Sequence, residues 1–129
     1  MFKQKSISLV LFILFLSLPV SAQIVPDDAT KVTPILVNST IPDVSVKTID
    51  GEKAALRTVV AEKPTILIFY RGGWCPYCSR HMAELQKIES QIVELGYQIL
   101  AISVDKPEVL RETLTKGELS YSLLSDSPA

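Results

Sequence analysis

The chain has 129 residues, of which 47% are hydrophobic, and its formal net charge at pH 7 is −1. This balance has neither the apolar excess of a polytopic membrane protein nor the polar excess of a disordered chain, and the length allows one domain. Two cysteines are too few for a disulfide-scaffolded mini-protein, and the charge excludes the concentrated basic face that nucleic acids require.

The N-terminus has the pattern of a secretory signal peptide. Two lysines precede an apolar stretch, residues 7–20, and small residues follow it up to Ala22. The stretch is shorter than the roughly 20 apolar residues that span a bilayer, which argues against the alternative of a membrane anchor. We therefore predict that residues 1–22 are a signal peptide cleaved after Ala22. The mature protein is then periplasmic or extracellular and has no stable membrane anchor.

The next segment predicts an extended lead-in followed by small elements. Residues 23–40 mix prolines and aspartates with scattered apolar residues. Residues 41–48 alternate in polarity before a turn at 49–52, which indicates a short hairpin. Residues 54–62 favour a short helix that Pro64 ends.

A strand and a long helix are predicted next. Residues 65–70 form a continuous apolar run, typical of a strand buried on both faces. From Cys75 or Pro76 the apolar period becomes helical, and Gly96 closes the helix. The apolar positions of this helix are Met82, Leu85, Ile88, Ile92 and Leu95.

The last part repeats the alternation of strand and helix. Residues 97–104 predict a second buried strand, Pro107 lies in the first turn of another helix that Gly117 breaks, and residues 121–124 begin a further strand. Alternating strands and helices are the signature of parallel β-α-β units. The sequence thus predicts one α/β sandwich domain over residues 41–129.

The two cysteines, Cys75 and Cys78, are three residues apart where the strand meets the long helix. The unpaired N–H groups and the positive dipole end of a helix N-terminus favour a thiolate, the reactive form of cysteine. Pro76 suits the first helical position because its missing N–H would be unpaired there. Cys78, one turn later, can attack a mixed disulfide formed at Cys75, so the pair can cycle between dithiol and disulfide.

A cysteine pair of this spacing can also be a structural disulfide or part of a metal site. A structural disulfide would close so short a loop that it would stabilise by only about 2 kcal/mol. A soft metal could be held by Cys75, Cys78 and His81, but a closed zinc site needs a fourth ligand and there is no second Cys pair. Redox activity is the favoured interpretation.

Three neighbours are candidate supporting residues of the site together with Pro76. Trp74 and Tyr77 are expected to form an apolar rim around the sulfurs. Arg71 is either solvated or stabilises the thiolate by its charge.

Residues 69–78 resemble the active-site segment of the thioredoxin-like superfamily, and more narrowly the peroxiredoxin-like branch of the alkyl hydroperoxide reductase/thiol-specific antioxidant (AhpC/TSA) family. Residues 41–43, 50–51, 102–108 and 123–126 are also similar to family segments. The resemblance implies a thioredoxin-like fold. It also implies a thiol-dependent activity without an organic cofactor, acting on a protein disulfide or dithiol partner or on a hydroperoxide.

The chain departs from the family pattern beside the cysteines. Typical peroxiredoxins carry a Pro, a Thr four residues later and the peroxidatic Cys three residues further on, positions that fall here on Arg71, Cys75 and Cys78. The peroxiredoxin resemblance therefore implies that Cys78 attacks peroxide, whereas the thioredoxin pattern makes Cys75 the attacking thiol. The missing Pro and Thr favour thiol–disulfide exchange.

A second departure concerns the end of the fold. Thioredoxin-like folds close with a cis-Pro loop, an antiparallel strand pair and a last helix. After Cys78 the only prolines are Pro107, at a helix start, and Pro128. We therefore expect the closing strands and the last helix to be absent, as in a truncated domain or an inactive fragment of a longer redox protein.

Overall fold

The computed structural model describes residues 26–128, and the predicted signal peptide lies outside them. The chain divides into two units, residues 1–37 and residues 38–129. In the described part of the first unit, the 3-10 turn η1 (Ala29–Lys31) is capped by Asp28, whose carboxylate accepts the Thr30 backbone N–H at 2.7 Å. No helix within the described residues is long and apolar enough to cross a bilayer.

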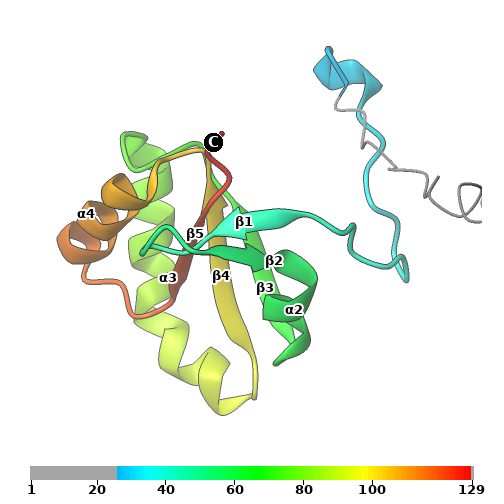
Figure 1. The fold of residues 1–129 in the computed structure, drawn as a ribbon. Coiled ribbons are helices and arrows are strands. Elements are labelled where there is room, and N and C mark those ends of the chain that lie inside the picture. Colours follow the sequence, from blue (N-terminus) through cyan, green and yellow to red (C-terminus); the bar gives the residue numbers. More distant parts are fainter. Residues whose placement is uncertain (1–25, 129) are drawn as a thin grey trace, which may run out of the picture. The chain divides into compact units, whose positions relative to one another are not determined.

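The second unit is built on one mixed five-stranded sheet, with the strand order β2-β1-β5-β4-β3 (Figure 1). Strand β4 lies between β3 and β5 and runs parallel to both. Strand β1 is antiparallel to β2 and to β5. This confirms the predicted hairpin and the predicted parallel units. The strands are β1 (Ser45–Lys47), β2 (Lys53–Ala55), β3 (Thr65–Phe69), β4 (Gln98–Ser103) and β5 (Ser122–Ser125).

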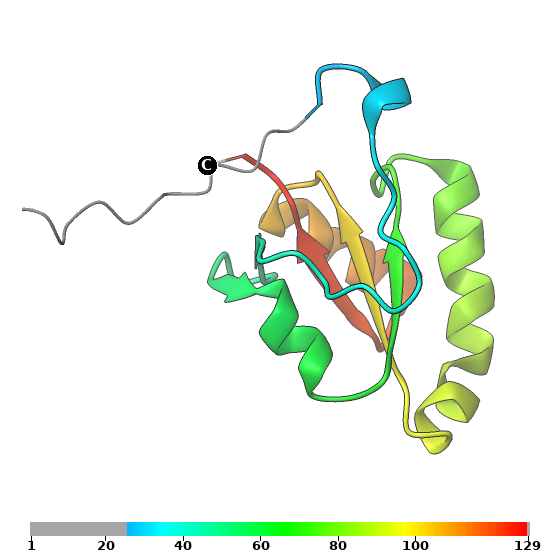
Figure 2. The ribbon, with the colours of Figure 1, turned by 90° about the vertical axis from the view of Figure 1, so that its right-hand side faces the viewer.

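Three α-helices cover the two faces of the sheet, as the two views show (Figures 1 and 2). They are α2 (Leu56–Ala61), α3 (Pro76–Glu94) and α4 (Pro107–Gly117). Helices α3 and α4 bury one apolar cluster against one face, centred on Met82, Leu110 and Leu123. Helix α2 buries the other cluster through Leu56 against Leu100 on the opposite face. The result is a three-layered α/β domain.

Helix α3 begins and ends where the sequence predicts. Pro76 occupies the first turn, and Gly96, just beyond the helix, has a φ of +84° that favours glycine. Of the five predicted apolar positions, Met82, Leu85 and Ile92 pack on the sheet. The other two, Ile88 and Leu95, are 44% and 76% exposed.

Strand β3 is more exposed than the sequence predicts. The apolar run of residues 65–70 indicates a strand buried on both faces, yet β3 is the last strand in the sheet order and pairs only with β4 in the described part of the chain. Its Ile66 and Phe69 are 37% and 72% exposed. The strand buried along most of its length is β4, which lies between β3 and β5 and in which five consecutive residues, 99–103, are buried. Periodicity shows that a strand is apolar but not where it lies in the sheet.

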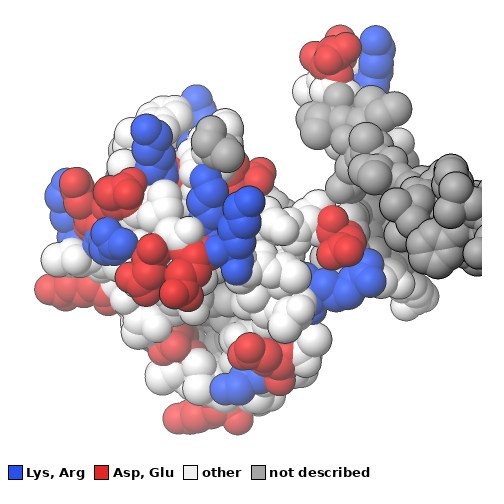
Figure 3. Space-filling model, in the orientation of Figure 1, with Lys and Arg blue, Asp and Glu red and all other residues white. Residues whose placement is uncertain are grey.

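Charged side chains of both signs are interspersed on the face seen in Figure 3, most densely over α4. Lys116 and Glu112 form an ion pair on α4, and Lys87 and Glu84 form another on α3. All four side chains are more than half exposed, so these pairs contribute little to folding stability.

Candidate active site

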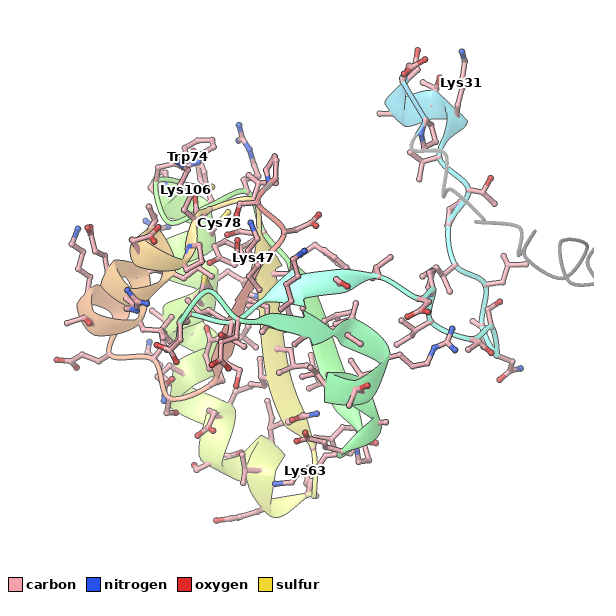
Figure 4. The ribbon with its side chains drawn as sticks, viewed as in Figure 1. Lys31, Lys47, Lys63, Trp74, Cys78 and Lys106 are labelled. Atoms are coloured by element: carbon pink, nitrogen blue, oxygen red, sulfur yellow. The ribbon has the colours of Figure 1, made fainter. Side chains whose placement is uncertain are left out.

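The cysteine pair lies at the sheet edge where the parallel strands end. In Figure 4, Trp74 and Cys78, which follow β3, lie at the same end of the second unit as Lys106, which follows β4. The carboxyl ends of parallel strands commonly carry the functional groups of open α/β sheets, since the loops that leave them converge there. The fold therefore places the loop after β4 beside the turn that leads into the cysteine pair.

The loop from β3 to α3 is a tight turn that needs two glycines. The Cys75 backbone N–H donates to the Gly72 carbonyl at 3.1 Å, which closes the turn. Gly72 has a φ of +142°, and a Cβ there would lie 2.6 Å from the Trp74 indole nitrogen. A Cβ on Gly73 would collide with the Thr113 hydroxyl of α4. A residue other than glycine would be strained by the φ of Gly72, and at Gly73 it would have to displace the Thr113 side chain.

Asp105 holds this turn from the neighbouring loop. Its carboxylate accepts the Gly73 backbone N–H at 2.7 Å and the Ser103 hydroxyl at 3.2 Å. Asp105 was not among the site residues that the sequence predicts. The available signal was its position directly after a parallel strand, which brings it to the same sheet edge as the cysteines.

Both cysteines are free thiols, with their sulfur atoms 2.7 Å apart. Cys75 is the N-cap residue of α3, and its sulfur accepts the Cys78 backbone N–H at 3.4 Å. The predicted placement at a helix N-terminus is thus what the structure shows. So close a pair needs only a small movement to form a disulfide.

The two thiols have pKa values displaced in opposite directions. The pKa of Cys75 is lowered chiefly by hydrogen bonds from the Cys78 thiol and the Cys78 backbone N–H. The pKa of Cys78 is raised, first because its thiol is the donor in that bond and then by burial. The Arg71 charge lowers both. The reduced pair therefore ionises more readily at Cys75 than at Cys78.

The two sulfurs also differ in their access to solvent. Cys75 is only 3% exposed, whereas Cys78 is half-buried and lines an open groove of about 300 Å³. The groove runs between the end of β3 and the first turns of α3. Its other lining residues are Ile68, Phe69, Tyr70, Arg71, Tyr77, His81 and Met82. A small or extended substrate in this groove meets Cys78 before Cys75.

The predicted supporting residues all lie around the pair. Trp74 and Tyr77 are 64% and 80% exposed, so neither is a core residue. The Arg71 guanidinium stacks over the Trp74 ring, 4.7 Å from its centroid, which holds the charge near the thiols. Pro76 lies in the first turn of α3.

The metal-binding alternative finds no support in this geometry. No group of three His, Cys, Asp or Glu side chains within residues 26–128 is placed to hold a metal ion. Cys75, Cys78 and His81 all belong to the described part, so the fold does not gather them into a ligand set.

A parallel β-α-β unit with a Cys-x-x-Cys pair at the N-terminus of its helix defines a thioredoxin-like protein. The model of the AhpC/TSA family matches residues 37–129. The chain belongs to the AhpC/TSA family, as its sequence predicts.

Characterised relatives are similar over the same region. The chain is 29% identical to the peroxiredoxin Bcp of Escherichia coli over 93 residues, which are 72% of this chain and 59% of that protein. It is 27% identical to the thiol-disulfide oxidoreductase ResA of Halalkalibacterium halodurans, over 60% of this chain and 44% of ResA. The crystal structure of peroxidoxin BcpB from Mycobacterium tuberculosis superposes with a TM-score of 0.62 at 22% identity, over 68% of this chain and 57% of that one. The chain thus spans about half the length of the relatives it matches.

Proposed function

We propose that this protein is a thiol–disulfide oxidoreductase in which Cys75 and Cys78 alternate between a dithiol and a disulfide. The observation that carries this proposal is the pair of sulfurs 2.7 Å apart at the N-terminus of α3. The opposite displacement of their pKa values favours ionisation of Cys75 over that of Cys78, which suits Cys75 to be the thiolate in thiol–disulfide exchange. Similarity to a protein named as a thiol-disulfide oxidoreductase supports it further.

Cys78 is the sulfur assigned to meet the substrate, because it lines the groove while Cys75 is buried. A substrate thiolate attacks the Cys78 sulfur of the protein disulfide, the bond to Cys75 breaks, and Cys75 leaves as a thiolate. Its lowered pKa makes it the better leaving group. The second substrate thiolate then attacks the substrate sulfur of the mixed disulfide, and Cys78 is released and takes up a proton. Two electrons pass from the substrate dithiol to the protein.

This order differs from the cycle that the thioredoxin pattern implies, in which Cys75 attacks first. The difference rests on exposure, since a sulfur must be approached in line with the bond that breaks. The pattern of residues along the chain carries no information about which sulfur faces the groove.

Hydroperoxide reduction is the second candidate, favoured by the same groove and by similarity to a protein named as a peroxiredoxin. The Cys78 sulfur would attack the terminal peroxide oxygen as its thiol proton passes to the leaving oxygen, so that the alcohol leaves and Cys78 becomes a sulfenic acid. The Cys75 thiolate would then condense with it, releasing water and forming the disulfide. In this reaction the protein is oxidised and the peroxide is reduced.

Trapping separates the two reactions. The oxidised wild-type protein should oxidise a reduced dithiol peptide stoichiometrically. Cys75→Ser, first activated at Cys78 as a mixed disulfide with a small aromatic thiol, should exchange that thiol for a peptide with a single thiol and retain the peptide on Cys78. Cys78→Ser, activated in the same way at Cys75, should not trap the peptide at a comparable rate. Peroxide consumption by the reduced wild type that is lost in Cys78→Ser would favour the peroxidase instead. Inertness in both assays of a folded protein would contradict the proposal.

Export of the protein is part of the proposal and is supported by the N-terminal pattern of residues 1–22 alone. An exported pair would work in a compartment that favours disulfides. Fractionation of cells that express the full chain tests it, with N-terminal sequencing of the product. A mature protein beginning at Gln23 is expected, and an uncleaved protein in the cytoplasm would contradict it.

A further inference from the structure

We propose that Asp105 is a positioning residue that sets the reactivity of the Cys75 thiolate, an inference that rests on the proposed redox function. Asp105 lies in the loop between β4 and α4 and is half-buried. Its Oδ2 accepts the Gly73 backbone N–H at 2.7 Å, a charge-assisted hydrogen bond of the strong kind. The hydrogen bond joins Asp105 to a turn that lies 32 residues earlier in the chain.

The contact reaches Cys75 through the turn itself. Gly72, the residue before Gly73, lies so close to Asp105 that a Cβ there would be 2.9 Å from Oδ1. The Gly72 carbonyl in turn accepts the Cys75 backbone N–H at 3.1 Å. Asp105 thus fixes the two residues that determine where α3 begins. The Cys75 sulfur depends on that start, because it accepts the first-turn N–H of Cys78 at 3.4 Å.

Asp105 is itself held by the ends of two strands. Its backbone carbonyl accepts the Ser125 hydroxyl of β5 at 2.6 Å, and its backbone N–H donates to the Ser103 hydroxyl of β4 at 3.2 Å. The Ser103 hydroxyl also donates to the Asp105 carboxylate. These bonds connect the ends of β4 and β5 to the redox turn. A group anchored in this way can hold a turn in one geometry rather than follow its motion.

The charge of Asp105 and its position act on the thiolate with opposite signs, which makes them separable. A carboxylate near a thiolate disfavours the charged form, so its charge alone would raise a thiol pKa. Its hydrogen bond to Gly73 keeps the turn closed and the thiolate at its donors. Asp105→Asn removes the charge and keeps an acceptor oxygen, while Asp105→Ala removes both.

The test is a pH titration of thiolate ultraviolet absorbance in the reduced full chain, which requires neither substrate nor turnover. At the pH where wild-type Cys75 is half ionised, Asp105→Ala should lower the thiolate fraction at least about twofold through loss of a charged hydrogen bond. Asp105→Asn should keep or raise the wild-type fraction. Asp126→Ala, an exposed carboxylate at the same sheet edge, is the matched control and should change nothing.

Other outcomes overturn the positioning role. An unchanged titration in Asp105→Ala would show that the turn holds itself, and an equal rise of the thiolate fraction in both variants would show that only the charge acts. If Asp105→Ala fails to fold, Ser125→Ala is the second variant, because it removes the hydrogen bond to the Asp105 backbone carbonyl. It should lower the thiolate fraction as Asp105→Ala does, but by less. An unchanged thiolate fraction in Ser125→Ala would also overturn the positioning role. Failure of the proposed oxidoreductase activity would leave these titrations unchanged, so the two failures are distinguishable.

Discussion

The Cys75 and Cys78 sulfurs lie 2.7 Å apart across the first turn of α3, but only Cys78 lines the neighbouring groove. The buried sulfur is the one whose pKa is lowered, and the accessible sulfur is the one whose pKa is raised. The fold therefore separates stabilisation of the thiolate from contact with a substrate. Such a division suits a disulfide that is attacked at one sulfur and releases the other.

The Cys78 thiol is expected to be the main cause of the acidity of Cys75. Removing this donor with Cys78→Ala should raise the pKa of Cys75, because the first cause of its lowering is the hydrogen bond from Cys78. Cys78→Ser keeps a hydroxyl donor and should retain part of the effect. Absorbance of the thiolate as a function of pH measures both. A lower midpoint in Cys78→Ala than in Cys78→Ser would contradict the assignment.

Gly72 should be far less tolerant of a side chain than Gly51. Both have positive φ, +142° and +83°, but a Cβ on Gly51 meets nothing within 4 Å whereas one on Gly72 meets Trp74 and Asp105. Gly51→Ala should cost about 1 kcal/mol of unfolding free energy from backbone strain alone. Gly72→Ala should cost at least about 2 kcal/mol. Urea denaturation of the two variants compares them, and equal losses would show that the close approach has no energetic consequence.

Leu110 should be the residue by which α4 is held on the sheet. It is fully buried in the cluster with Met82 and Leu123, whereas the adjacent Val109 is 40% exposed. Leu110→Ala should lower the free energy of unfolding by about 2–5 kcal/mol through lost burial and a residual cavity. Val109→Ala, on the same helix, should lower it by less than about 1 kcal/mol. Thermal or urea unfolding measures the difference, and similar losses would mean that α4 does not pack as described.

Tyr121 should make the fold sensitive to alkaline pH. Its hydroxyl donates to the Met82 carbonyl of α3 at 3.1 Å, and burial raises its pKa from 10.0 to about 12. Because the folded pKa is the higher one, the stabilisation is complete below pH 10 and is lost as the pH rises through about 12. Tyr121→Phe should lower the free energy of unfolding by about 1 kcal/mol near neutral pH. Above pH 10 its free energy of unfolding should decline less than that of the wild type. Tyr97→Phe, which is 45% exposed at the start of β4, is the control. Parallel declines in Tyr121→Phe and the wild type would contradict this role.

Local patterns predicted most of the elements. The apolar period of residues 76–95, with Pro76 at its start and Gly96 after it, is sufficient for α3, and the hairpin follows from alternation around a turn. The Cys75 and Cys78 pair was found in the same way, because its position between a strand and a helix is readable from residues adjacent in the chain. The predicted domain limits, including the lead-in of residues 23–40, stay predictions.

Contacts between segments distant in the chain could not be predicted from local sequence patterns and were seen only in the tertiary structure. The sequence alone determined the family, the order of strands and helices and the two sulfurs at a helix N-terminus, since these depend on short-range periodicity and capping. Only the folded chain showed that β3 is the last strand of the sheet in the described residues, that Cys78 rather than Cys75 lines the groove, and that Asp105 reaches Gly73 across 32 residues. Strand pairing and side-chain exposure are properties of the packed sheet, and the same apolar run satisfies the local rules in the centre of a sheet or at its edge.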